Sequence, residues 1–418
     1  MGSSIAGLAA PQTIRETGIR QSLLEDLAVK ILFLNGEMLL LELAKRMCLS
    51  LGTVEELFQN LRKEHLCEVK GMALGSHRIA PSAEGKTRAA ELLTISQYAG
   101  PAPVSLMDYN IRVRTQSIQQ TEVKPENVTR AFRELVLDEN VLLRLGTALV
   151  SGAAMLLHGP SGTGKTSITE RLSGIYDDSV WIPHAVEVEN QIITVFDSGV
   201  HRPADGTFAD EVDRRWVLCH RPRVVTGGEL TIEMLDLQFS AVSRFYSAPL
   251  QMKANNGILV IDDLGRQRIR PEQLLNRWMT PLSRRVDFLT LPGGREFEIP
   301  FDVFVVFATN ADPEQLADQA FLRRIPNKIS VGYASEEEFR KIFRRASDAL
   351  LLDCPEKALD RLIRLITDEY KEPLRPCYAR DILQQVFWAA TYRREEARLD
   401  EETIEEASRN YFLSSKSS

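Results

Sequence analysis

The chain has 418 residues, of which 44% are hydrophobic and 26% charged, and this composition excludes disordered, collagen-like and disulfide-dense proteins. Because 51 Lys and Arg stand against 58 Asp and Glu, the formal net charge is −7, so no overall basic field favours nucleic-acid binding. The 5 cysteines are scattered without metal-ligand spacing, which indicates reduced thiols. Neither a signal peptide nor a membrane-spanning apolar run is recognised. We therefore expect a cytoplasmic protein without a membrane span.

The first part of the chain predicts a tail followed by a small helical domain. Residues 1–18 are rich in Gly, Ala and Thr and predict a loose tail. Within 19–97, apolar residues at helical spacing predict one helix that stops at Asn35-Gly36, a second over 39–47 and a third that begins after Ser50. The segments CEVKGM and HRIAP then predict a two-stranded hairpin. This order resembles a winged helix-turn-helix.

The rest of the chain predicts a linker, an α/β core and a helical end. Two prolines and a glycine in YAGPAPV, followed by a polar stretch, predict a linker over 98–127. Continuous apolar runs at 154–158, 257–261 and 303–308 predict strands of a parallel sheet covered on both faces, within a core over 128–334. Residues 335–418 predict a C-terminal helical domain with a break at the prolines of 373–376.

The strongest motif, at 159–166, matches GxxxxGK(S/T) with a strand before it and a helix after it. Glycines let backbone N–H groups turn around phosphates, a lysine supplies charge for the β- and γ-phosphates, and a hydroxyl ligates Mg²⁺. The expected ATP-binding residues are Gly159, Pro160, Ser161, Gly162, Thr163, Gly164, Lys165, Thr166 and Ser167.

Two further strands end in polar side chains suited to the same chemistry. Asp262 and Asp263 follow the strand at 257–261, where the first acid would hold Mg²⁺ with Thr166 and the second would polarise the attacking water. An Asp at the second place is shorter than the usual Glu by one methylene, about 1.5 Å of reach, which predicts either slow hydrolysis or binding without turnover. Asn310 ends the strand at 303–308 and is the candidate sensor of the γ-phosphate.

Three arginines are candidates for phosphate contacts. Arg323 and Arg324 follow a short helix after the third strand, and either would serve as an arginine finger that reaches the site of a neighbouring subunit. We favour Arg324 of the two, against the alternative that both are solvated or salt-bridged. Arg380 lies near a predicted helix N-terminus, where a cation lacks support from the helix dipole. It contacts either a phosphate or, in the plainer alternative, its neighbour Asp381.

Together, these motifs over 128–412 resemble an AAA+ ATPase, with Walker A, Walker B, sensor 1, arginine finger and sensor 2 in order. A hairpin expected over 285–301, turning at Pro292-Gly293-Gly294, is similar to the clade of MoxR-type chaperones and ring helicases. The segment after the second strand stands where AAA+ proteins carry a pore loop. Its aromatic residues, Phe245 and Tyr246, are candidates for that role or for ordinary core packing.

A closer resemblance extends over nearly the whole chain, through VFDSGVHRP, GGELTIEMLDL, LQMKANNGILVIDDLGRQR, LLNRWMTPL and AFLRRI. These segments resemble a bacterial family of AAA+ ATPases described as chaperones associated with Flp (tight-adherence) pilus assembly. The resemblance implies the double Asp as a family pattern, and it implies a winged-helix-like N-terminus beside the ATPase core. It also implies a pilus or secretion component as a partner.

The expected function is therefore an oligomeric, Mg²⁺- and ATP-dependent ATPase that remodels a protein client, with ATP hydrolysed at subunit interfaces. A DNA-linked ATPase or transcription regulator is the alternative, motivated by the winged helix. The third helix carries Glu55, Glu56 and Glu64 beside Arg62 and Lys63, and this charge balance favours protein docking over phosphate contacts. A nucleotide switch that barely hydrolyses ATP, suggested by Asp263, is the third hypothesis.

Overall fold

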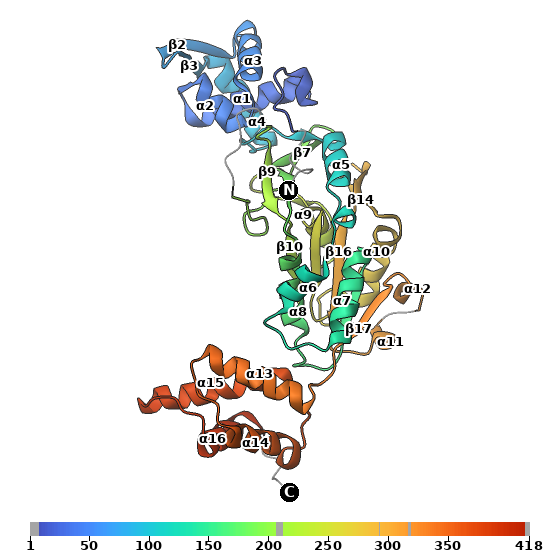
Figure 1. Ribbon diagram of the computed structural model, residues 1–418. Helices are drawn as coiled ribbons and strands as arrows, with labels where there is room; N and C mark the ends of the chain where they lie inside the picture. The colour runs from blue at the N-terminus through green and yellow to red at the C-terminus, as the bar shows by residue number, and fades with distance from the viewer. Residues whose placement is uncertain (1–7, 206–211, 292, 317–318, 414–418) are drawn as a thin grey trace.

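The computed structural model describes residues 8–205, 212–291, 293–316 and 319–413. Along its length the chain forms an N-terminal module, an α/β core and a C-terminal helical unit, which follow one another through the molecule (Figure 1). Within the described ranges, no helix is long and apolar enough to cross a membrane.

The N-terminal module contains the predicted helices and hairpin, together with one more helix and a short third strand. Gly36 ends the first helix with φ of 77°, and the Ser50 hydroxyl caps the third by accepting the Thr53 N–H at 3.3 Å. The strands form an antiparallel sheet in the order β1-β3-β2. The elements are α1 (Gln21–Asn35), β1 (Met38–Leu39), α2 (Leu40–Met47), α3 (Leu51–Lys63), β2 (Cys67–Ala73), β3 (Ser76–Pro81) and α4 (Ala83–Ile95).

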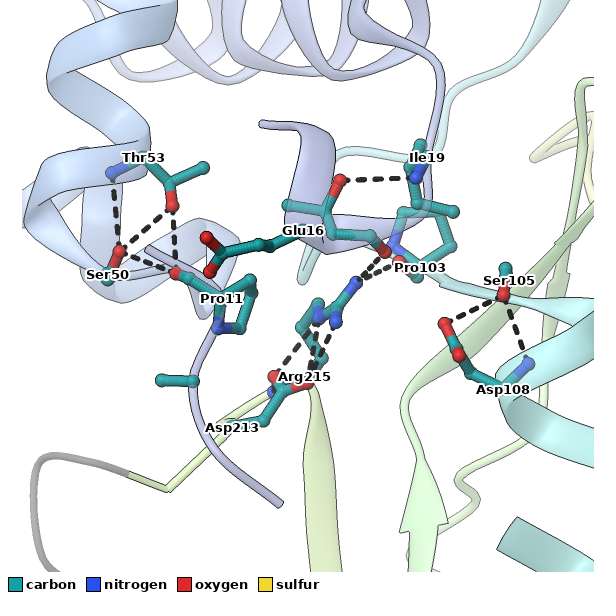
Figure 2. A network of polar contacts seen from close by, with 12 residues as sticks. Pro11, Glu16, Ile19, Ser50, Thr53, Pro103, Ser105, Asp108, Asp213 and Arg215 are labelled. Atoms are coloured by element: carbon teal, nitrogen blue, oxygen red, sulfur yellow. Dashed lines mark hydrogen bonds and ion pairs between the residues drawn. The ribbon is translucent and has the colours of Figure 1, made fainter. Parts of the chain in front are cut away.

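The described part of the expected tail, residues 8–18, is bound to the rest of the molecule instead of being loose. Ala9 forms an antiparallel bridge with Val212, and a short 3-10 helix, η1 (Arg15–Thr17), follows. The Pro11 carbonyl accepts hydrogen bonds from the hydroxyls of Ser50 (2.7 Å) and Thr53 (2.9 Å), as Figure 2 shows. We call residues 8–18 the strap. Sequence composition misses it because its partners lie far along the chain.

Arg215, which forms a buried ion pair with Asp213, joins the strap to the segment 213–215 (Figure 2). Its guanidinium pairs with Asp213 at 2.8 Å, and the two side chains are 5% and 4% exposed. It also donates to the carbonyls of Thr17 (2.8 Å) and Pro103 (3.3 Å). One side chain therefore holds the strap, the segment after the module and residues 213–215 together.

The segment expected to be a linker is ordered and packed. It contains β4 (Val104–Ser105), α5 (Leu106–Thr115) and η2 (Ile118–Gln120). Tyr109 and Val113 of α5 are buried, and the Ile118 N–H donates to Asp302 at 2.9 Å. These contacts make residues 98–120 part of the folded body.

The core is a five-stranded parallel sheet in the order β10-β13-β16-β5-β17. Residues of β13 and β16 are buried on both faces, as their continuous apolar runs predict. The strands are β5 (Met155–His158), β10 (Arg223–Thr226), β13 (Gly257–Ile261), β16 (Val303–Thr309) and β17 (Asn327–Ser330). Because all run the same way, their carboxyl ends meet at one edge.

Helices cover both faces of this sheet. Alternate strand residues pack against α6 (Pro125–Phe132), α7 (Glu139–Ser151) and α8 (Lys165–Arg171), which continues as η3 (Leu172–Ile175). The opposite face packs against α10 (Pro271–Arg284), with Trp278 at its centre, and against Phe321 of α12 (Gln319–Leu322), which follows α11 (Pro313–Leu316). The hairpin expected before the third strand is confirmed as β14 (Val286–Thr290) paired with β15 (Glu296–Pro300). Pro292 of its turn lies outside the described residues.

Two groups of strands lie between the N-terminal module and the core, and the sequence did not indicate them. Their order is β11-β12-β8-β7-β4 in one sheet and β6-β9 in a separate pair. They are short and follow no clear alternation. The strands are β6 (Ser179–Pro183), β7 (Ala185–Val188), β8 (Gln191–Thr194), β9 (Trp216–His220), β11 (Gln238–Phe239) and β12 (Tyr246–Ser247), with η4 (Glu233–Leu235) and α9 (Leu250–Lys253) nearby.

The C-terminal unit is helical, with the predicted break before its long helix. Its elements are α13 (Glu336–Ala349), α14 (Glu356–Arg364), a π-helical turn η5 (Leu365–Glu369), α15 (Pro376–Arg393) and α16 (Glu401–Tyr411). These helices form an apolar core of their own, made of residues from this unit.

Candidate functional site

The loop over 159–166 connects β5 to α8 at the carboxyl edge of the parallel sheet. Gly159, Gly162 and Gly164 have φ of 144°, 81° and 95°, a region that favours glycine. A Cβ on Gly159 would lie 2.2 Å from the Val331 carbonyl oxygen. The glycines of the motif are therefore required by backbone conformation and close packing.

Lys165 is buried at the start of α8, with its ammonium inside the loop. Nζ donates to the carbonyl oxygens of Gly159 at 2.8 Å and Pro160 at 2.7 Å. Burial lowers the pKa of Lys165, while the nearby carboxylates of Asp262 and Asp263 act in the opposite direction. The loop thus holds a cation whose present partners are neutral carbonyls, which a phosphate group would replace as a stronger acceptor.

The predicted metal ligands lie side by side. Thr166 Oγ1 is 3.0 Å from Asp262 Oδ2, across the gap between the start of α8 and the end of β13. Mg²⁺ prefers oxygen ligands and is held in such sites by one or two protein groups, with water and phosphate oxygens completing the shell. This hydroxyl and carboxylate fit that donor set. Among the residues that the structure describes, no group of three or more His, Cys, Asp or Glu could hold a metal by itself.

Asp263 and Asn310 are also brought together. Asp263 has φ of 51°, and its backbone N–H donates to Asp262 Oδ1 at 2.9 Å. Asn310, which follows β16, donates from Nδ2 to Asp263 Oδ1 at 2.8 Å. Because β16 lies between β5 and β13 in the sheet, Asn310 is placed between the phosphate loop and the two acids.

Two supporting residues were not found from the sequence. Gln267 donates from Nε2 to the Asp262 carbonyl at 2.8 Å and accepts the Gly265 N–H at 2.8 Å, so it braces the turn that carries Asp263. The Thr309 hydroxyl donates to the Leu264 carbonyl at 2.9 Å. Neither residue stands in a motif, so only the folded turn reveals them.

The candidate arginines lie apart from this cluster. Arg324 donates from Nε to Ser283 Oγ at 2.9 Å and from a terminal nitrogen to the Ala320 carbonyl at 2.5 Å, whereas Arg323 is exposed. Arg380 is 84% exposed and lies 3.6 Å from Asp381, which is the plainer of its two expected contacts. Figure 1 shows the segment after α12 on the side of the core.

The C-terminal unit contacts the phosphate loop directly. The backbone N–H of Cys377, in the first turn of α15, donates to the Gly162 carbonyl at 3.1 Å. A Cβ on Gly162 would lie 2.6 Å from Cys377 Sγ, so the two segments are in close contact. A cavity of about 410 Å³ opens beside them and is lined by Ser161 and Gly162 of the loop and by Arg375 and aromatic side chains of the C-terminal unit.

The two aromatic pore candidates are part of the packing. Tyr246 is 6% exposed in β12. Phe245 is partly buried and meets Tyr98 edge-on, with ring centroids 5.4 Å apart. Both residues therefore fit ordinary core packing, the alternative to a pore-loop role.

One family model and several solved structures are similar to parts of the chain. A family model described as "Domain of unknown function (DUF8689)" matches residues 335–410, and no curated protein matches the chain. The structure of NtrX from Brucella abortus in complex with ADP is similar at 13% identity and a TM-score of 0.41, over 66% of this chain and 56% of that one. The Thermotoga maritima RuvB Holliday junction branch migration motor is similar at 14% identity and a TM-score of 0.37, over 68% of this chain and 69% of that one. This chain thus spans little more than half of the NtrX chain.

Proposed function

We propose that the chain is a Mg²⁺-dependent ATPase of the AAA+ superfamily. The observation that carries the proposal is the meeting of the phosphate loop with Thr166, Asp262, Asp263 and Asn310 at one edge of a parallel sheet. These residues come from three different strand ends, and their types match those needed to bind and hydrolyse a nucleoside triphosphate.

In this proposal each side chain has one task. Lys165 exchanges its carbonyl partners for the β- and γ-phosphates, while the N–H groups of the loop surround them. Thr166 and Asp262 hold Mg²⁺, which when bound neutralises developing charge on the phosphate oxygens. Asp263 accepts a hydrogen bond from the attacking water and thereby orients it, and Asn310 fixes that carboxylate. The protein contributes position and charge, and no covalent intermediate is required.

We further propose that a neighbouring copy of the chain completes the site. The exposure of Arg323 supports its role as the residue that reaches across. Arg324, favoured from the sequence, is held by Ser283 and Ala320 of its own chain, and it would have to give up these bonds to act as a finger. Both remain candidates. Arg380, on an exposed face of α15, is proposed to contact the phosphates within its own chain.

The N-terminal module is proposed to be a winged helix that docks a protein client, with a pilus or secretion component as the candidate. The tip of its hairpin supports protein docking, since Met72 near the end of β2 is 68% exposed and Leu74 in the turn is 92% exposed. Apolar side chains gain little from a phosphate backbone. The exposed Glu55 and Glu56 of α3 add negative charge to the same module. Salt-sensitive binding of duplex DNA in a gel-shift assay would support the DNA-linked alternative instead.

The test is ATP turnover per subunit as a function of protein concentration, with the Lys165→Ala, Arg323→Ala and Arg324→Ala variants. We expect turnover to rise with concentration, to be lost with Lys165→Ala, and to be lost with one of the two arginine variants. Arg398→Ala, a change at a 77% exposed surface residue, serves as the matched control. Turnover that persists on dilution to monomer would contradict a shared site. Tight ATP binding with turnover near zero at every concentration would support the nucleotide switch.

A further inference from the structure

Arg375 lies where the C-terminal unit meets the phosphate loop. It is the last residue before α15, and its Cδ and Cβ lie 3.4 Å and 3.6 Å from the position that a Cβ on Gly162 would occupy. Its neighbour in the helix, Cys377, donates its N–H to the Gly162 carbonyl. The aliphatic part of Arg375 therefore lies beside the loop, next to the backbone hydrogen bond between Gly162 and Cys377.

The charged end of Arg375 is held between two tyrosines. The guanidinium carbon lies 5.8 Å from the ring centroid of Tyr333 and 5.7 Å from that of Tyr378, within the range of cation–π attraction. A terminal nitrogen pairs with Glu372 at 3.0 Å, and Tyr378 donates its hydroxyl to the same carboxylate at 3.3 Å. We call Arg375, Tyr333, Tyr378 and Glu372 the clamp.

Tyr333 places the clamp at the connection between the core and the C-terminal unit. Tyr333 belongs to the segment between β17 and α13, which is the covalent connection from the core to the C-terminal unit. Tyr378 and Glu372 belong to the C-terminal unit itself, and the stem of Arg375 contacts the core at Gly162. One side chain therefore touches the connection, the helical unit and the phosphate loop.

One polar atom of Arg375, the buried Nε, lacks a hydrogen-bond partner among the described residues. The Arg375 side chain also lines a cavity of about 410 Å³, together with Ser161 and Gly162 of the loop. Arg380, by contrast, has its side chain 84% exposed, with Asp381 at 3.6 Å as its ion-pair partner. Of the two arginines, Arg375 is the one fixed against the loop.

We infer that Arg375 is a positioning residue that couples nucleotide in the phosphate loop to the angle of the C-terminal unit. Binding of phosphate draws Lys165 away from the carbonyls of Gly159 and Pro160, and the loop adjusts at Gly162. The stem of Arg375 transmits this shift, and the stacked guanidinium carries it to Tyr333 at the connection. The inference rests on the proposed ATP site, and it adds a residue that no sequence motif marks.

The test uses the intact chain with four variants at the clamp. Arg375→Ala removes the cation of the clamp, and Tyr333→Leu removes one of the two rings that the cation contacts. The loss of contacts of this kind predicts a KM for ATP raised by about tenfold. The value of kcat at saturating ATP should stay within about twofold of the native value, since the catalytic acids are untouched. Arg375→Lys keeps the charge but not the planar stack, so it should not restore the native KM. Tyr333→Phe keeps the aromatic ring and should therefore have the native KM for ATP.

A second readout follows the connection itself. ATP should protect the segment between β17 and α13 from proteolysis in the native chain and in Tyr333→Phe, and this protection should be lost in Arg375→Ala and Tyr333→Leu. Tyr333 is 45% exposed, so Tyr333→Leu tests the clamp even if Arg375→Ala does not fold. Arg398→Ala is the matched control on the same unit.

Failure of the two proposals gives different results. If the native chain binds no ATP, or binds it equally well with Lys165→Ala, then the ATP site itself is wrong. If the native chain binds ATP but Arg375→Ala and Tyr333→Leu keep both the native KM and the ATP-dependent protection, only the coupling role of Arg375 is overturned. A fall in kcat with an unchanged KM would likewise overturn it.

Discussion

Replacing Arg215 with alanine should detach the strap and weaken the whole N-terminal half of the molecule. The guanidinium is 5% exposed and pairs with Asp213, which is 4% exposed. Removing it leaves a buried carboxylate without a cation and leaves the carbonyls of Thr17 and Pro103 without this donor. Breaking a buried pair from one side costs about 3 to 5 kcal/mol. At about 1.4 kcal/mol per factor of ten, this lowers the folded-to-unfolded ratio by roughly 10²- to 4 × 10³-fold. The loss of the bond to the Thr17 carbonyl also loosens the strap itself.

Trypsin provides a direct assay because the strap and its junction with α1 contain Arg15 and Arg20, both exposed. We expect cleavage at these residues to accelerate in Arg215→Ala, together with a lower urea midpoint. Arg295→Ala is the matched control, since its pair with Glu189 is 72% and 57% exposed and should contribute only about 0 to 1 kcal/mol. Equal cleavage rates and midpoints in the two variants would refute the assignment of the strap's attachment to Arg215.

Three further changes test the site and the interior. Asp263→Asn should retain ATP binding but lower turnover by about 10²- to 10⁴-fold if Asp263 acts as the base, measured by steady-state hydrolysis beside a binding titration. Gly162→Ala should weaken ATP binding and destabilise the fold by about 1 to 3 kcal/mol, because φ is 81° and the new Cβ would lie 2.6 Å from Cys377 Sγ; an unchanged melting curve would argue against that contact. Burial lowers the pKa of Lys30 from 10.5 to about 8, so the unfolded chain binds more protons between these values and stability should rise with pH across that window. Lys30→Met should stabilise the protein at pH 7 and abolish that rise in urea titrations at pH 8 and 10.5.

The local signals in the sequence predicted the parts of the site that follow from short-range rules. The phosphate loop needs glycines at fixed places, and buried parallel strands read as apolar runs, so the sequence alone indicates Lys165, Asp262 and Asn310 as candidates. The strap was missed because its bonds join Pro11 to Ser50 and Thr17 to Arg215, and a Gly- and Ala-rich segment gives no sign of such partners. The short strands between β6 and β9 also lack a clear period.

The two ends of the molecule are attached to the core in different ways, and this difference predicts where motion occurs. The N-terminal module shares its apolar core with the sheet β11-β12-β8-β7-β4, through Ala185 and Ile192. The buried Arg215 adds hydrogen bonds to the carbonyls of Thr17 and Pro103. The C-terminal unit has an apolar core of its own. Its described contacts with the α/β core include the Cys377 bond, the Arg375 stem and hydrogen bonds from Arg345 to the carbonyls of Arg133 and Leu135.

A shared apolar core resists separation, whereas a few polar contacts exchange at low cost. Nucleotide in the phosphate loop should therefore turn the C-terminal unit about the segment at Tyr333. The N-terminal module should move with the sheet β11-β12-β8-β7-β4 as one body. If the module docks a client as proposed, ATP hydrolysis would act on that client chiefly through rearrangement between subunits. The concentration dependence of turnover and the proteolysis of the connection thus address the two halves of one mechanism.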